Sequence, residues 1–255
     1  IGAAVQIPHL GWVVRGFYGR YYQAPPLVTV TNSTLNSDQS FLPLHGERDE
    51  QREFGVAIPL RGWTVELSNF RTGAHNFFDH DALGNSNVFF PLTLQHARIR
   101  GWEAVAKSPQ IAGRAQFHLA YSHQYAEWSG AVTGGLVRGA GGSCDQLCFL
   151  DHDQRNTVST GVNLSLPWRS STDLNVNYGS GFLNGDGLTA PTHLPEHTSF
   201  DLALAKSFGE KLSLRLTGLN LSNNHYMLDN SNTFGGTHFT NPREISAQLR
   251  YSFRY

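Results

Sequence analysis

Apolar and polar side chains alternate strictly along residues 243–255. One side of this stretch carries Ile245, Ala247, Leu249, Tyr251, Phe253 and Tyr255, and the other carries Glu244, Ser246, Gln248, Arg250, Ser252 and Arg254. A period of two predicts a β-strand with one apolar and one charged face. About 9–11 tilted residues cross the hydrocarbon of a bilayer, so the stretch is long enough to be a transmembrane strand.

The same alternation recurs upstream and predicts about eleven strands in the chain. Besides a short apolar segment at residues 3–7 and the terminal stretch, the expected strands lie at residues 12–22, 50–59, 63–78, 88–107, 114–128, 157–166, 172–182, 200–204 and 212–216. The predicted fold class is therefore all-β, an antiparallel transmembrane β-barrel or a part of one.

The connections between these strands alternate between short and long. Short links are expected at residues 8–11, 60–62, 108–113, 167–170 and 209–210. Long ones are expected at residues 23–49, 79–87, 129–153, 183–196 and 223–242. Outer-membrane barrels have short periplasmic turns and long extracellular loops. This pattern predicts the Gram-negative outer membrane as the location, with the C-terminus in the periplasm.

Composition agrees with a barrel and argues against several other classes. The 255 residues carry a net charge of −1, and charged residues make up 15%, so no basic surface favours a nucleic-acid partner. No run of 18 apolar residues predicts a transmembrane helix. Trp12, Trp63 and Trp168 lie at or next to short turns, where a barrel places its interfacial aromatic belt.

The two cysteines, Cys144 and Cys148, lie together in a long connection. In an oxidising compartment a local disulfide is expected between them. The alternative is a metal site completed by the neighbouring residues Asp151, His152 and Asp153.

The twelve histidines raise the question of a metal site, which the sequence does not support. Two Asp-His-Asp triplets occur, at residues 79–81 and 151–153. Successive strand residues point to opposite faces, so such a triplet in regular backbone cannot place three side chains on one ion. We expect both triplets to be polar loop residues at the membrane rim, with no bound metal and no cofactor. The sequence contains no HExxH, P-loop or GxGxxG motif and no Ser-His-Asp spacing, and we expect no enzymatic activity.

Several short motifs resemble the C-terminal half of TonB-dependent outer-membrane receptors. Residues 21–25 (Tyr-Tyr-Gln-Ala-Pro) resemble the aromatic–x–Ala–Pro signature at a strand exit. Glu47 followed by residues 52–56 (Arg-Glu-Phe-Gly-Val) resembles the entry to the next strand, with Gly46 in place of the usual Pro.

Three further matches to this family lie downstream. Residues 100–103 (Arg-Gly-Trp-Glu) resemble the Gly-x-Glu that opens a long strand. Residues 219–221 (Leu-Asn-Leu) with Tyr226 resemble the Asn-Leu…Tyr near the penultimate strand. Residues 241–243 (Asn-Pro-Arg) resemble the entry to the family's last strand. The matched motifs span nearly the whole chain and are mainly structural.

The resemblance implies a 22-stranded barrel, of which this chain would supply residues 1–255 as the C-terminal half, without the plug domain and without the TonB box. It also implies outer-membrane lipid, the TonB complex, a scarce small-molecule ligand and the barrel assembly machinery as partners. That machinery would read the last strand, in which Tyr251, Phe253 and Tyr255 are the expected signal. The TonB complex would act through the N-terminal part that this chain lacks.

By the same resemblance the parent protein would import an iron chelate, cobalamin or an oligosaccharide. The candidate ligand contacts are aromatic and histidine residues of the long connections: Phe41, His45, His80, Tyr226, Phe234 and His238. Two rival functions remain at this point. A passive porin-like channel would require a complete closed barrel. A soluble β-sandwich binding module would bury Phe117, Leu119, Val162, Leu164, Leu202 and Leu214 in a dry core.

Overall fold

The computed structural model describes residues 1–25, 41–82, 89–136, 143–151, 153–184, 192–230 and 237–253. Every regular element in these ranges is a β-strand. The described part of the chain has no helix with the length and hydropathy needed to cross a membrane. The expected all-β class is confirmed.

One large antiparallel sheet contains an unbroken path of eleven strands, in which each strand pairs with the neighbours that precede and follow it on the path. Its members are β1 (Gly2–Gln6), β2 (Val13–Gln23), β4 (Glu47–Leu60), β5 (Trp63–Ala82), β6 (Phe89–Lys107), β7 (Ala115–Leu136), β9 (Asn156–Leu166), β10 (Ser170–Gly179), β13 (His197–Phe208), β14 (Leu212–Leu219) and β17 (Glu244–Tyr251). This path confirms the strand number expected from the alternation of the sequence.

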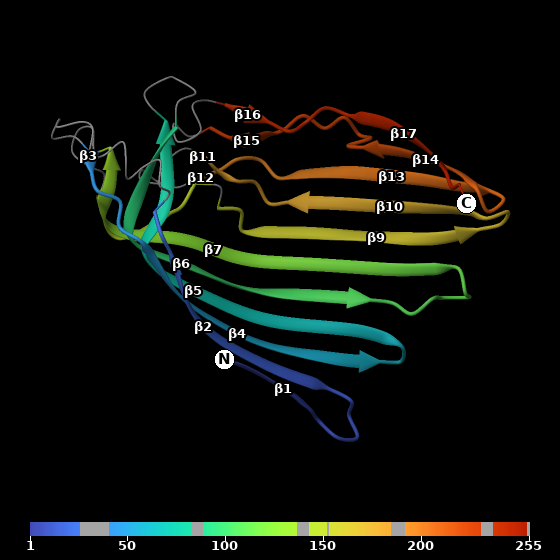
Figure 1. The fold of residues 1–255 in the computed structure, drawn as a ribbon, viewed down its shortest axis with the longest axis horizontal. Helices are drawn as coiled ribbons and strands as arrows, with labels where there is room; N and C mark the ends of the chain where they lie inside the picture. Colours follow the sequence, from blue (N-terminus) through green and yellow to red (C-terminus); the bar gives the residue numbers. More distant parts are fainter. Residues whose placement is uncertain are drawn as a thin grey trace.

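In the described ranges, six short strands lie at one end of the sheet. They are β3 (Phe41–Leu42) and β8 (Ser143–Phe149), which pair with β7, and the hairpins β11 (Leu183–Asn184) with β12 (Thr192–His193) and β15 (Met227–Asp229) with β16 (His238–Phe239). Figure 1 shows β3, β11, β12, β15 and β16, which belong to the long connections, at one end of the sheet, whereas the tight turns lie at the opposite end. The alternation of short and long connections along the chain therefore corresponds to the two opposite ends of the sheet.

The tight turns have local causes in the sequence. Leu60 pairs with Trp63 across a two-residue loop. Both loop residues, Arg61 and Gly62, have positive φ, at 49° and 85°. Such a turn matches the right-handed twist of the strands that it joins.

Several boundaries differ from those expected. Residues 129–153 were expected to be a glycine-rich loop, but β7 continues to Leu136 and β8 follows. The extension is possible because Gly130 and Gly135 adopt positive φ, which lets the strand bend. Beyond the end of β9, β8 and β3 pair with β7 and satisfy its backbone hydrogen bonds. The last strand also ends earlier than expected, at Tyr251, so Phe253 lies beyond it.

The pairing register keeps one apolar face continuous across the path. Val14, Val56, Leu67 and Ala104 are successive direct partners on β2, β4, β5 and β6, and Leu174, Leu202 and Gly218 continue the face farther along the sheet. Direct partners in antiparallel strands lie on the same face. We call this side the outer face and the opposite side the inner face.

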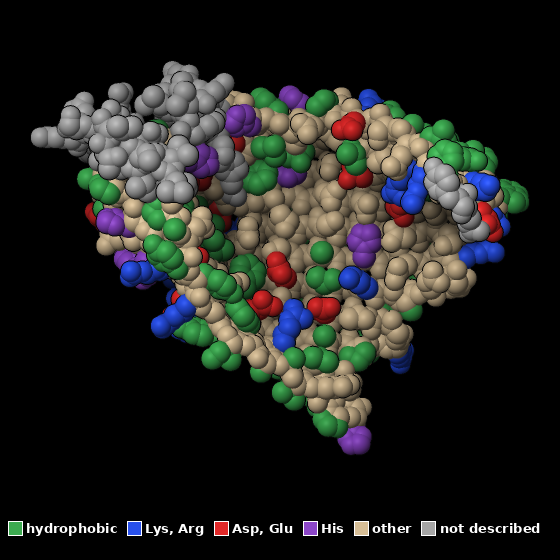
Figure 2. All heavy atoms as spheres, viewed as in Figure 1, with side chains coloured by type: hydrophobic (Ala, Val, Ile, Leu, Met, Phe, Trp, Pro, Cys, Tyr) green, Lys and Arg blue, Asp and Glu red, His purple; other side chains and the backbone are tan. Residues whose placement is uncertain are grey.

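Over much of its height the outer face is exposed and apolar, which is a poor arrangement for a soluble protein. Phe117 and Leu119, which a soluble sandwich would bury, are 42% and 41% exposed. The inner face is the hollowed, sparsely hydrophobic side seen in Figure 2, with acidic and basic side chains at its centre. An apolar exterior and a polar interior are typical of an outer-membrane barrel wall. The structure therefore argues against the sandwich alternative.

A small packed core lies at the long-connection end. Trp128, Ala97 and Leu94 are buried there with Cys144 and Leu150. Trp128, Ala97 and Ala74 are cross-strand partners on the inner face. Their burial fixes the bent ends of β5, β6 and β7 relative to β8.

Candidate functional site

One arginine and two glutamates form a charged cluster on the inner face of β2, β4 and β5. The Arg15 guanidinium lies 3.4 Å from the Glu53 carboxylate and 3.1 Å from that of Glu66. Gly55, the direct partner of Arg15, leaves room for it, because a Cβ at that position would lie 2.9 Å from the Arg15 side chain. One arginine thus bridges two carboxylates from neighbouring strands while all three remain partly exposed to the interior.

Farther along the sheet the inner wall is a chain of amide and carboxylate groups. Ser159 donates to the Asn177 side chain at 2.9 Å, and Asn177 donates to Asp201 at 3.1 Å. The other Asp201 oxygen accepts the backbone N–H of Asn220 at 2.8 Å. These bonds orient polar groups across β9, β10 and β13 and make a wall that can exchange hydrogen bonds with a polar solute.

An aromatic and histidine cluster lies above this wall at the long-connection end. The His197 ring stacks on Tyr226 with centroids 3.8 Å apart and on Phe182 at 5.7 Å. Nearby, His225 stacks on Phe239 at 4.6 Å. A cavity of about 370 Å³ opens beside the cluster and is lined by Tyr226, His197 and residues of the inner wall. Stacked rings at the mouth of a cavity offer flat surfaces for an aromatic or chelate ligand.

The expected ligand contacts fall into two groups in the structure. Tyr226 and His238 belong to the β15–β16 hairpin, where Met227 pairs with Phe239. His80 lies at the end of β5, and His45 is exposed just before β4. Phe41 lies in β3, but its side chain and the whole of Phe234 lie outside the described residues. Tyr226 and His238 therefore lie on one hairpin, whereas His80 and His45 lie elsewhere in the structure.

The structure places both cysteines in β8 and joins Cys144 to Cys148 in a disulfide. In the described ranges, no three His, Cys, Asp or Glu side chains are arranged to hold a metal ion. At the C-terminal end of the sheet, the rings of Tyr251 and Phe253 touch edge to face with centroids 4.7 Å apart, and both are exposed. Tyr255 lies outside the described residues.

Two buried residues at the long-connection end, His197 and Asp153, were not recognised as important from the sequence. His197 is buried between two rings, whereas the sequence pattern placed it between an expected connection and an expected strand, without a role. Asp153 was expected to be a polar residue at the rim but is 1% exposed. It accepts the backbone N–H of Ala126 at 2.8 Å and pairs with Arg155 at 2.9 Å. The only signal in the sequence was the repeated Asp-His-Asp triplet, whose second copy ends at Asp153.

Comparison with known proteins identifies the fold. The family model described as TonB dependent receptor-like, beta-barrel matches residues 3–221. No curated protein sequence matches the chain. Among solved structures, the chain is similar to the copper transporter OprC, with 12% identity and a TM-score of 0.69 over 98% of this chain and 37% of that one.

Two further structures show the same likeness. The ferric-catecholate import receptor Fiu from E. coli K12 has 15% identity and a TM-score of 0.65, over 99% of this chain and 34% of that one. The FrpB iron transporter from Neisseria meningitidis has 15% identity and a TM-score of 0.69, over 99% and 38%. The chain spans little more than a third of these relatives. From the family match, the chain belongs to the TonB-dependent receptor family, within its β-barrel.

Proposed function

We propose that this chain forms the C-terminal part of the barrel of an outer-membrane transporter that imports a scarce ligand with energy from the TonB complex. The observation that carries the proposal is the register of the eleven-strand path, which keeps an apolar outer face and a polar inner face in line from β1 to β17. That arrangement serves a wall between lipid and a water-filled lumen.

The two ends of the path support a larger barrel. Among the described residues, β1 pairs only with β2, and β17 pairs only with β14. Unpaired strand edges are costly in lipid, because no water is available to satisfy their backbone groups. Transporters of this architecture close with 22 strands and a plugged lumen. We therefore propose that another part of the protein supplies the remaining strands, the plug and the TonB box.

The long-connection end and the relatives support a metal chelate as the ligand class. OprC is named a copper transporter, Fiu a ferric-catecholate import receptor and FrpB an iron transporter. A metal chelate fits stacked rings and imidazoles such as Tyr226 and His238, with cobalamin or an oligosaccharide as alternatives.

We further propose an orientation in which the long connections face outward and the C-terminus lies in the periplasm. There the barrel assembly machinery would read Tyr251, Phe253 and Tyr255.

The first test is to read the coding sequence upstream of Ile1. A plug-like domain and a TonB box after a signal peptide would support the proposal. A signal peptide directly before Ile1 would overturn it and favour a small passive channel.

The second test is uptake of radiolabelled ferric catecholate and ferric citrate by cells that carry the full gene, with and without TonB. We expect saturable uptake of at least one chelate that disappears when TonB is deleted. Uptake that is linear in concentration and independent of TonB would contradict the proposal.

A further inference from the structure

The outer face is not apolar over its whole height. Beyond the apolar rows, toward the long connections, β2 and β4–β7 carry three successive cross-strand rows of charged, histidine and tyrosine side chains. The first row is Tyr18, Arg52, Arg71, Arg100 and Tyr125; the second is Arg20, Glu50, Gly73, Arg98 and Glu127; the third is Tyr22, Arg48, His75, His96 and Ser129. We call these three rows the basic belt.

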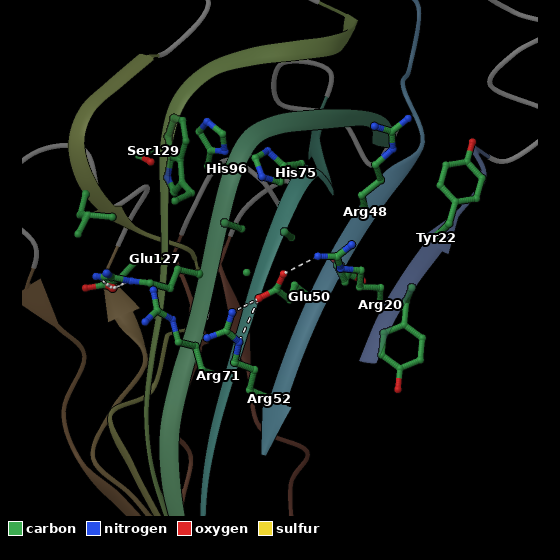
Figure 3. Close-up of a pocket in the computed structure, with 18 residues that line it drawn as sticks. Arg20, Tyr22, Arg48, Glu50, Arg52, Arg71, His75, His96, Glu127 and Ser129 are labelled. Carbon is green, nitrogen blue, oxygen red and sulfur yellow. Dashed lines mark hydrogen bonds and ion pairs between the residues drawn. The ribbon is translucent and has the colours of Figure 1, made fainter. Parts of the chain in front are cut away.

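The belt surrounds a groove of about 840 Å³, shown in Figure 3. Five arginines line the groove, together with three carboxylates. Two of the carboxylates are already engaged: Glu50 pairs with Arg20 and Arg52, and Glu127 pairs with Arg98 and Arg100. The third, Asp49, is the direct partner of Ala74 and belongs to the inner face. The groove therefore keeps an excess of positive charge.

The first row is an unfavourable arrangement unless something lies against it. Arg52 is the direct partner of Arg71, and Arg71 is the direct partner of Arg100. Direct partners have Cβ atoms about 4.5–5.5 Å apart, and like charges in such pairs destabilise a sheet. Arg71 and Arg48 have no carboxylate partner among the described residues. A bound anion between these guanidiniums would remove the repulsion.

The middle of the belt is open. Gly73 stands in the second row between Glu50 and Arg98, and a Cβ at this position would meet no atom within 4 Å. Tyrosine rings flank the first row, with Arg100 over Tyr125 at 4.8 Å and Arg52 over Tyr18 at 5.8 Å. The planar guanidiniums lie beside tyrosine rings and around the open space at Gly73. This arrangement is suited to bidentate binding of phosphate.

The position of the belt relative to the apolar rows indicates which class of phosphate-bearing molecule it meets. The next row toward the tight turns contains Phe54, Asn69 and Trp102, and the rows beyond it are apolar. Two strand residues advance only about 7 Å, so the arginines begin directly beyond the apolar band and its aromatic border. That is the depth of lipid headgroups, and basic side chains at this depth recognise anionic lipids.

We propose that the basic belt is a binding site for a phosphorylated glycolipid of the outer leaflet, held by its headgroup phosphates. This inference rests on the proposed membrane orientation of the chain, with the long connections outside. The acyl chains would lie along the apolar rows below the belt, and the phosphates would lie between Arg48, Arg71 and Arg98. The candidate ligand site beside His197 and Tyr226 lies on the inner face, which is the opposite side of the sheet.

The experiment measures lipid binding by the full-length protein, purified in detergent and stripped of native lipid. The probes are lipid A with two phosphates, lipid A with one phosphate, and inorganic phosphate, each followed by native mass spectrometry. The test variant is Arg48→Gln with Arg71→Gln, which removes two cations without leaving a carboxylate unpaired. We expect affinity for lipid A with two phosphates to fall about 10- to 30-fold, from the usual contribution of two basic residues near a membrane surface.

Two further variants make the result specific. Lys107→Gln with Arg250→Gln removes the same charge from the inner face and should leave lipid affinity unchanged. Gly73→Leu fills the open floor without adding or removing charge and should weaken lipid binding without lowering assembly into the membrane. Equal losses in the inner-face and belt variants would overturn the proposal, because they would show a nonspecific charge effect.

The other outcomes are equally decisive. Binding of inorganic phosphate as tight as that of lipid A would show a free-anion site and overturn the lipid assignment. If the protein inserts and imports its chelate, but the belt variant binds lipid A as tightly as the wild type, then this inference fails alone. If the protein does not fractionate with the outer membrane, the proposed function fails first.

Discussion

Tyr226 lies flat against the imidazole of His197, with ring centroids 3.8 Å apart and planes 10° from parallel. This contact joins the base of the β15–β16 hairpin to the first residue of β13. It therefore ties a residue expected to contact ligand to the rigid wall of the sheet.

We expect Tyr226→Ala to weaken ligand binding roughly 2- to 10-fold, because a stacked aromatic pair contributes about 0.5–1.5 kcal/mol and positions the hairpin. Tyr226→Phe keeps the ring and should bind nearly as the wild type does. Titration of the full protein with ferric chelates measures both. An equal loss in the two variants would show that the hydroxyl, not the stacking, matters.

The two faces of β10 can be tested with neighbouring residues. Leu174 lies on the outer face and is 40% exposed, whereas Asn175 lies on the inner face. Leu174→Arg should destabilise the barrel by about 2–4 kcal/mol, the cost of an arginine facing the middle of a bilayer. Asn175→Arg should cost little, since its side chain enters the lumen. Urea unfolding of protein refolded into phospholipid vesicles gives the free energies, and similar costs for both would contradict the assignment of faces.

Asp153 is the most deeply buried carboxylate of an ion pair at the long-connection end. Asp153→Ala leaves Arg155 and the Ala126 N–H without their carboxylate partner, and we expect a loss of roughly 3 kcal/mol in the free energy of unfolding. Asp173→Ala is the matched control, because Asp173 pairs with Arg215 at 3.1 Å in a more exposed setting. That control should cost less than about 1 kcal/mol. Equal losses would mean that burial of Asp153 is not what matters.

The raised pKa of Glu47 predicts that the stability of the long-connection end depends on pH. It lies at the loop end of β4, beyond the basic belt and outside the hydrocarbon. Burial, the largest cause, acts together with the Asp49 carboxylate to raise the pKa of Glu47 to about 6, against the opposing hydrogen bond from the Phe78 N–H. The folded state then binds a proton more tightly than the unfolded state, whose pKa is about 4.3. Stability from this group is present below that value and is lost as pH rises through about 6.

We therefore expect the free energy of unfolding to fall between about pH 4.5 and pH 6.5, and Glu47→Gln to reduce this slope. Thermal unfolding followed at several pH values measures it. Asp173→Asn removes a carboxylate elsewhere in the wall and serves as the control. An unchanged slope in Glu47→Gln would show that another group is responsible.

The sequence alone determined the eleven strands of the main path to within a few residues for most of them, their faces and the end at which each connection lies. These features are local: a period of two sets which side chain points outward, and Gly, Pro and polar residues mark the breaks. This is why residues 63–78 and 157–166 were placed close to β5 and β9. It is also why the outer face of β17 was recognised from Ile245, Ala247 and Leu249 alone.

The tertiary structure decided which residues from different strands meet. The row of Arg52, Arg71 and Arg100 exists only because three strands pair in one register, and in the sequence these arginines lie far apart among ordinary polar residues. The burial of Asp153, the continuation of β7 and the stacking of Tyr226 on His197 likewise depend on segments distant in the chain. A local pattern fixes the face of a strand, but register is set by pairing between strands, and that pairing is what builds the sites.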